Sequence, residues 1–112
     1  MTPNQINERL AVGVMGWGIV INPNGCDYYT LMGITMSNVI NFNPYTNISQ
    51  AFMLVDKMRE RGYGFMLVTN NAPELNWTAV FDSYPSEWNE WRADNDIPSQ
   101  AICLAIIETL DQ

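Results

Sequence analysis

Histidine is absent from the 112 residues of the chain. Because histidine is the commonest general base and the commonest neutral metal ligand, its absence excludes Ser-His and Cys-His nucleophilic sites and histidine-based zinc sites. The sequence offers no other nucleophile-base pair or metal-binding constellation. We therefore expect a protein that is not an enzyme, with no catalytic residues, no cofactor and no metal site.

Basic residues are scarce, since five lysines and arginines stand against twelve aspartates and glutamates, for a net charge of -7. This balance disfavours binding to a phosphate backbone, so we expect no direct nucleic-acid partner. Cysteine is scarce as well. Cys26 and Cys103 are too few and too far apart for a metal knuckle, and this apolar chain does not need a disulfide to fold. A reducing, cytoplasmic setting is the expectation.

Long apolar runs are also missing, because none approaches the roughly 18 residues that a membrane-spanning helix needs. The first residues lack the apolar core of a signal peptide, which again favours a cytoplasmic protein with no membrane partner. The length and the 47% hydrophobic content are typical of one globular domain, which we place at residues 1–112.

Capping signals predict two helices in the first half of the chain. Thr2 is followed three residues later by Gln5, the pattern of a capping box, and we expect this helix to end before Trp17. Asn47 is the N-cap candidate of a second helix, and Gly62 is a residue that can end it in the left-handed conformation.

A third helix is predicted over residues 97–110, opening after Asp96. Its residues are apolar around most of the helix circumference, which is typical of a helix that is buried on more than one side. In so small a domain we expect the second apolar face to meet another copy of the chain, and the protein to be a homo-oligomer.

Strand patterns lie between these helices. Residues 63–69 and 77–82 have a period of two, which predicts an antiparallel hairpin. Neither face of the second strand is clearly a solvent face, so we expect a sheet that is covered at least partly on both sides. In residues 18–47 the turn signal at residues 22–25 leaves a short hairpin and a long ordered loop as alternatives.

Acidic and aromatic residues are interleaved in one segment near the third helix, which we interpret as a loop or a single helical turn. Its carboxylates are those of Asp82, Glu87, Glu90, Asp94 and Asp96. The segment lacks the ligand spacing of a calcium loop, and paired-carboxylate catalysis needs a more rigid element. The remaining alternatives are a solvated face, held to the core by Trp88 and Trp91, and a patch that binds a partner.

Four fragments together carry a family resemblance, namely residues 14–17, 45–51, 55–58 and 98–103. They resemble the phage α-β-α sandwich domain family of small phage and prophage proteins, and the similarity extends over most of the chain. The resemblance implies an α+β fold in which a small antiparallel sheet is covered by helices on both faces. Residues 18–44 form a longer insert than this family usually has.

The resemblance also implies a phage accessory protein that counters host antiviral defence by binding, in the cytoplasm of the infected bacterial host. The first hypothesis is an oligomer that sequesters a nucleotide-derived immune signal through aromatic stacking and a cation. Its ligand-binding residues are Trp17, Trp88, Trp91 and Arg92. The alternative is an anti-CRISPR-like inhibitor that binds a host defence enzyme. Its partner-binding residues are Asp82, Glu87, Glu90, Asp94 and Asp96.

Overall fold

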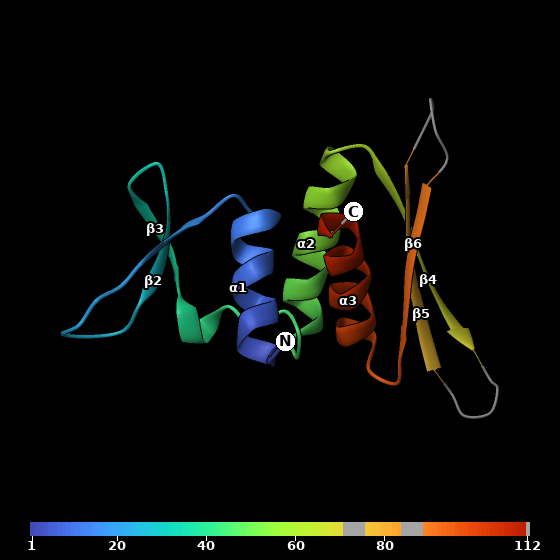
Figure 1. The fold of residues 1–112 in the computed structure, drawn as a ribbon, viewed down its shortest axis with the longest axis horizontal. Helices are drawn as coiled ribbons and strands as arrows, with labels where there is room; N and C mark the ends of the chain where they lie inside the picture. The colour runs from blue at the N-terminus through green and yellow to red at the C-terminus, as the bar shows by residue number, and fades with distance from the viewer. Residues whose placement is uncertain (71–75, 84–88, 112) are drawn as a thin grey trace.

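The computed structural model describes residues 1–70, 76–83 and 89–111, and Figure 1 shows their arrangement. The helices in these ranges are α1 (Pro3–Gly13), α2 (Ile48–Glu60) and α3 (Pro98–Leu110), with a short 3-10 turn η1 (Val39–Asn41). The first sheet is antiparallel and has the order β1-β2-β3, with β1 (Gly18–Val20), β2 (Tyr28–Leu31) and β3 (Ile34–Asn38). The second sheet, also antiparallel, has the order β4-β5-β6, with β4 (Tyr63–Asn70), β5 (Asn76–Ser83) and β6 (Asn89–Asn95).

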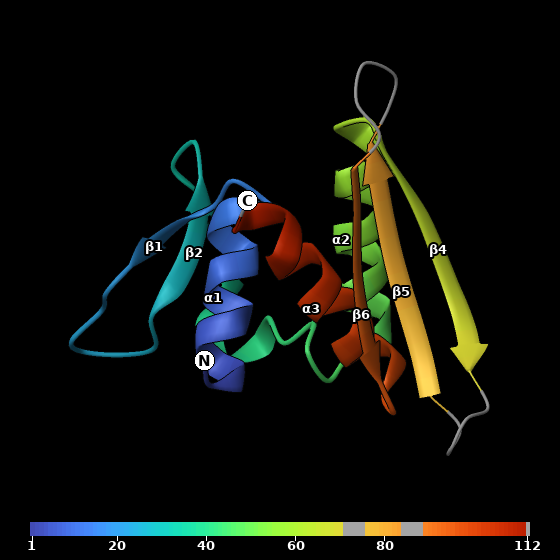
Figure 2. The same ribbon diagram turned by 45° about the vertical axis from the view of Figure 1, so that its right-hand side comes forward.

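The two sheets lie at opposite ends of the molecule, and the helices lie between them (Figures 1 and 2). α2 packs against β4, while α3 packs against β5 and β6. α1 contacts α3 in turn, and the sheet β1-β2-β3 lies on the far side of α1. The α+β class expected from the sequence is confirmed.

The third helix is enclosed from several sides. Its buried residues are Ser99, Ala101, Ile102, Cys103, Ala105, Ile106, Ile107 and Thr109. One side of α3 meets β5 and β6, and other sides meet α1 and α2 of the same chain. The prediction of a helix buried on more than one side is confirmed, but its apolar faces are used within one chain. The homo-oligomer stays a prediction, and its subunits would have to meet through a surface other than that of α3.

The first two helices begin where their capping residues predict. The side chain of Thr2 accepts a hydrogen bond from the Gln5 backbone N–H (3.2 Å), and the Gln5 side chain accepts one from Thr2 N–H (2.8 Å). α1 then ends at Gly13. The Asn47 side chain accepts from the N–H of Gln50 (3.1 Å), which completes the cap of α2.

The segment after α2 closes two helices at once. Gly62 has a φ of +97°, the left-handed conformation expected at the end of α2. Arg61, just before it, donates to the backbone carbonyl oxygens of Gly13 (2.9 Å) and Val14 (2.5 Å). A guanidinium at these otherwise unsatisfied carbonyls also favours the negative end of the α1 dipole. This residue therefore ties the end of α2 to the end of α1.

The hairpin predicted after α2 is present, with β4 and β5 in register from Tyr63↔Ser83 to Asn70↔Asn76. The interpretation of residues 82–96 as a loop or helical turn is wrong, because residues 89–95 form strand β6 beside β5. The alternation of polar Glu90, Arg92 and Asp94 with Trp91 and Ala93 is a strand pattern. Pairing with β5 supplies the backbone hydrogen bonds that the isolated segment could not make.

Residues 18–47 contain more strand than either sequence alternative allowed. The predicted turn is present, since the N–H of Gly25 donates to the carbonyl of Asn22 (3.2 Å). A second turn joins β2 to β3 through Met32 and Gly33, whose φ angles are +52° and +81°. Two residues with positive φ are the geometry of a tight hairpin turn. The result is a three-stranded sheet.

Amide side chains join α1 to the segment before α2. The buried Asn7 side chain donates to the Asn43 side chain (2.7 Å) and accepts from the backbone N–H of Tyr45 (3.1 Å). The carbonyl of Tyr45 accepts from the Ser99 hydroxyl at the start of α3 (2.9 Å). Asn7 therefore positions three segments that are far apart in the sequence.

We expect the substitution Asn7→Ala to lower the free energy of unfolding by about 1–3 kcal/mol, because it leaves the Tyr45 N–H and the Asn43 amide without their partner. Asn4→Ala is the matched control, since Asn4 is exposed on the same helix. Urea denaturation of both variants measures the difference. Equal effects would contradict a structural role for the buried amide.

Burial of α3 can be tested with a matched pair of isoleucines. Ile106 is fully buried, whereas Ile21 is 67% exposed. Ile106→Ala should cost about 2–5 kcal/mol of stability, because it leaves a cavity in the hydrophobic core. Ile21→Ala should change stability by less than about 0.5 kcal/mol. A small loss for Ile106→Ala in thermal and urea unfolding would show that α3 is not enclosed.

Candidate functional site

The sheet β4-β5-β6 has one face turned toward the helices and one turned away. Ala79 and Phe81 are fully buried in the core, so their strand neighbours Thr78, Val80 and Asp82 point to the other side. In both ribbon views α2 and α3 lie on one side of this sheet (Figures 1 and 2). We call the opposite side the outer face.

The strand register places the residues of the outer face in three rows across β4, β5 and β6. The rows are Gly64–Asp82–Glu90, Met66–Val80–Arg92 and Val68–Thr78–Asp94. Three carboxylates and one guanidinium therefore share this face.

Hydrogen bonds hold two of these carboxylates. The Asp94 side chain accepts from the hydroxyl of Thr78 on the neighbouring strand. Glu90 forms an ion pair with Arg92 (2.8 Å), whose side chain is 62% exposed. An ion pair this exposed adds little stability, but it orients the Glu90 carboxylate on the face. The acidic groups are thus anchored to strands, whereas a flexible loop would leave them unordered.

The outer face also has an apolar part. Met66 and Val68 on the edge strand β4 are 52% and 39% exposed. Thr78 and Val80 on the central strand are buried, although none of the described helices covers this face. The expectation that neither side of this strand is a solvent face therefore holds at these two residues. Exposed apolar side chains beside charged ones are typical of protein-binding surfaces.

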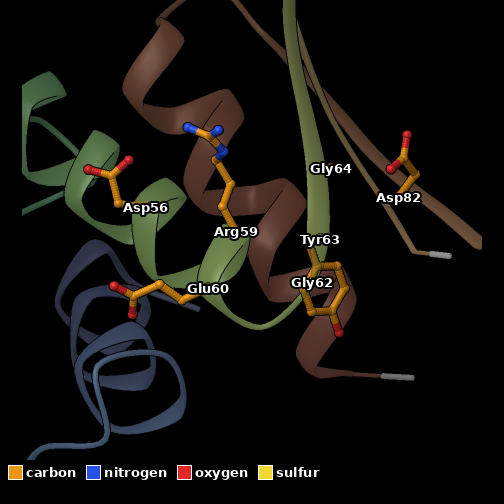
Figure 3. A pocket seen from close by; sticks show the side chains of 7 residues that line it. All are labelled: Asp56, Arg59, Glu60, Gly62, Tyr63, Gly64 and Asp82. Carbon is orange, nitrogen blue, oxygen red and sulfur yellow. The ribbon is translucent and has the colours of Figure 1, made fainter.

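An open hollow of about 830 Å³ lies where α2 meets the second sheet, and Asp82 is one of its walls. Its other lining residues are Asp56, Arg59, Glu60, Gly62, Tyr63 and Gly64 (Figure 3). A Cβ atom on Gly64 would lie 2.3 Å from a carboxylate oxygen of Asp82, so this position needs glycine as long as Asp82 keeps its place. With three carboxylates against one guanidinium, the hollow disfavours a phosphate group.

Three of the four predicted ligand-binding residues lie in the described part of the chain, and these three do not share one surface. Trp17 is only 6% exposed, and its ring packs against Tyr29 and Phe42 at centroid distances of 5.8 and 4.9 Å. Trp91 packs on Tyr63 on the inner side of the second sheet, while Arg92 points to the outer face. Stacking on Trp17 would require this packing to open.

Trp88 lies outside the described residues. Within the described part of the chain, a shared stacking site therefore remains a prediction.

The structure brings three of the predicted partner-binding residues together. Asp82, Glu90 and Asp94 share the outer face, and Asp96 is exposed in the turn that leads into α3. Glu87 lies outside the described residues. Sequence reasoning missed Met66 and Val68, which complete this surface. Their signal was the alternation of β4, but alternation alone does not tell which side the helices cover.

Within the ranges that the structure describes, the titratable groups with altered pKa values do not form a reaction centre. Burial raises the pKa of the Cys103 thiol to about 12, and burial together with the charge of Glu8 raises the pKa of Tyr29. The hydrogen bond from Arg9 lowers the pKa of Asp111 on the surface. The described residues contain no group of acidic or cysteine side chains that could hold a metal ion. No helix in the described ranges is long and apolar enough to cross a membrane.

Comparison with known proteins identifies a family. The family model described as "Phage ABA sandwich domain" matches residues 8–107. No curated protein and no solved structure matches the chain. The match covers all the described residues of both sheets, and thus the whole described outer face.

The two cysteines should differ in reactivity, since Cys26 is exposed and Cys103 is buried. At mildly alkaline pH we expect a disulfide reagent such as DTNB to label one thiol in the folded protein and both in denaturant. The raised pKa keeps the buried thiol protonated and unreactive. The variant Cys26→Ser should lose the fast reaction. Rapid labelling of Cys103 in this folded variant would contradict its burial.

Proposed function

Since the chain belongs to the Phage ABA sandwich domain family, we propose that it is a non-enzymatic phage accessory protein that binds and inhibits a host defence enzyme. The outer face of the second sheet is the binding surface, and its target is a basic patch on that enzyme. The observation that supports this proposal is the gathering of Asp82, Glu90 and Asp94 on one rigid face. The family indicates that the protein comes from a phage, and the proposed target is an enzyme of the infected cell.

Charge makes this face suited to a basic partner. The whole chain carries a net charge of -7, so a basic protein is attracted from a distance and is then steered to the carboxylates. Because Asp94 is held by Thr78 and Glu90 by Arg92, little side-chain freedom is lost on binding. The same face repels nucleic acid, so it competes for a basic cleft that would otherwise bind a phosphate backbone.

The apolar part of the outer face contributes binding free energy that does not depend on charge. Met66 and Val68 are exposed on the strand next to the row of buried central residues. Burying them against a partner removes apolar area from water, a contribution that salt does not screen. We therefore expect an association rate that falls with salt and a complex that still persists at moderate ionic strength.

Sequestration of a nucleotide-derived signal has less support from the described residues. Trp17 and Trp91 lie in different packing layers, and Arg92 points away from both. The open hollow is lined by Asp56, Glu60 and Asp82, which repel the phosphates of such a signal. A thermal shift with a nucleotide would distinguish this hypothesis from binding to a host enzyme.

The test uses phage infection of bacterial strains that each carry a single antiviral system. Expression of the chain should restore plaque formation on at least one strain. The double variant Glu90→Lys/Asp94→Lys should abolish this effect, because it reverses the charge of the outer face. Binding to the purified enzyme of that system should weaken by at least about tenfold.

A matched control separates the face from net charge. Glu8→Lys/Glu108→Lys makes the same charge change at exposed residues of α1 and α3, and it should retain full activity. Equal loss in both double variants would contradict the assignment to the outer face, and no rescue on any strain would contradict the host-defence role. A large thermal shift with a nucleotide, unaffected by Glu90→Lys/Asp94→Lys, would favour sequestration instead.

A further inference from the structure

The sheet β1-β2-β3 has an apolar face that continues beyond the point where the body of the protein covers it. Tyr29 on this face is fully buried, and its ring lies 5.8 Å from Trp17 and 5.9 Å from Phe42. Ile19 stands opposite Tyr29 in the register, and Leu31 follows it by two residues. Ile34 stands opposite Leu31. Since cross-strand partners and alternate residues share a face, these aliphatic residues continue the face of Tyr29.

These aliphatic residues are exposed, in contrast to Tyr29. We define the aliphatic patch as Ile19, Leu31, Met32 and Ile34, which are 37%, 39%, 94% and 67% exposed. Met32 is the non-glycine residue of the described chain with a positive φ, and it forms the tip of the hairpin with Gly33. Such positions favour asparagine, aspartate or glycine. An apolar side chain presented at a strained turn indicates a contact that the single chain does not make.

We propose that the part of the aliphatic patch on and beside β3, formed by Leu31, Met32 and Ile34, binds a second copy of this chain in a symmetric dimer. In this dimer the part of β3 between the turn and the register shift pairs antiparallel with the same part of β3 in the second copy, and the two sheets become one sheet of six strands. β3 and β1 are the edges of the sheet, so β3 has hydrogen-bonding groups that no strand in the described chain satisfies. A two-fold axis needs one self-complementary surface, and an apolar patch beside an edge strand meets that requirement.

Charge favours a second copy at this end of the molecule. Between Arg9 and Asp56, Asp27 is the only charged residue of the sequence. The acidic outer face lies at the opposite end of a molecule 48 Å long (Figure 1). Screening in physiological salt acts over about 8 Å, so two chains that meet through their neutral sheets keep their acidic ends beyond this distance. A basic partner, by contrast, is attracted to the outer face.

The location also explains how a homo-oligomer arises although α3 is already enclosed. The apolar circumference of α3 is covered by α1, α2 and the second sheet. The aliphatic patch is apolar surface that the described chain leaves exposed on the first sheet, where Met36 of β3 is also 43% exposed. Its pairing leaves the outer face of the second sheet open in both copies, so dimerisation and partner binding do not compete.

Sedimentation velocity of the full chain over a wide concentration range tests the proposal. We expect a monomer-dimer equilibrium. Ile34→Lys should raise its dissociation constant by at least about tenfold, because the substitution puts a charge into the patch of both copies. Met66→Lys is the matched control, since Met66 is 52% exposed on the outer face and the charge change is the same. It should leave the dissociation constant unchanged.

A backbone variant tests the pairing of the edge strands. Leu31 and Ile34 flank the two-residue turn, so they form the hydrogen-bonded pair, and the next pair, Thr30 and Thr35, directs its backbone groups outward. Thr35→Pro removes an N–H that points away from β2 and should therefore keep the hairpin but weaken the dimer. Circular dichroism and thermal melting check that Ile34→Lys and Thr35→Pro remain folded.

Three outcomes would overturn the proposal. One is a monomer at every concentration. Another is an oligomer whose dissociation constant is unchanged in Ile34→Lys and Thr35→Pro. The third is a monomer that floats with phosphatidylcholine vesicles and loses this binding in Ile34→Lys, which would assign the patch to a lipid surface.

Discussion

The enclosure of α3 is the constraint on which the rest of the structure depends. A helix that is apolar around most of its circumference is stable only if other elements cover it from several sides. The second sheet covers α3 on one side, and α1 and α2 cover it on others. This demand places the helices in the middle of the molecule and the sheets at its ends, so each sheet has a face directed away from the helices. Those faces are available for partners.

The two ends of the molecule therefore differ in chemistry. The first sheet belongs to a stretch with a single charged residue, and it exposes aliphatic side chains. The second sheet exposes three carboxylates beside a short apolar strip. Apolar surface without charge suits association between identical acidic chains, while fixed carboxylates suit a basic partner. A small protein can in this way combine self-association with binding at separate surfaces.

The acidic site could be predicted from the sequence only in part. The density of carboxylates between residues 82 and 96 identified Asp82, Glu90 and Asp94, but the segment was interpreted as a loop or helical turn. Its strand character depends on pairing with β5, which the composition of the segment itself does not reveal. Trp17 was predicted to bind a ligand, but it packs with Tyr29 and Phe42. The sequence alone does not distinguish a tryptophan packed in the core from one that is exposed to a ligand.

Local chemistry determined what the sequence alone could establish. The starts of α1 and α2 follow from Thr2 and Asn47, and the end of α2 follows from Gly62, because capping involves residues only a few positions apart. The α+β class and the -7 charge are equally properties of the chain itself. Only the tertiary structure decided that α3 is covered by its own chain, and that three carboxylates meet on one face. Both depend on which sheet face the helices cover, and strand alternation is the same for either choice.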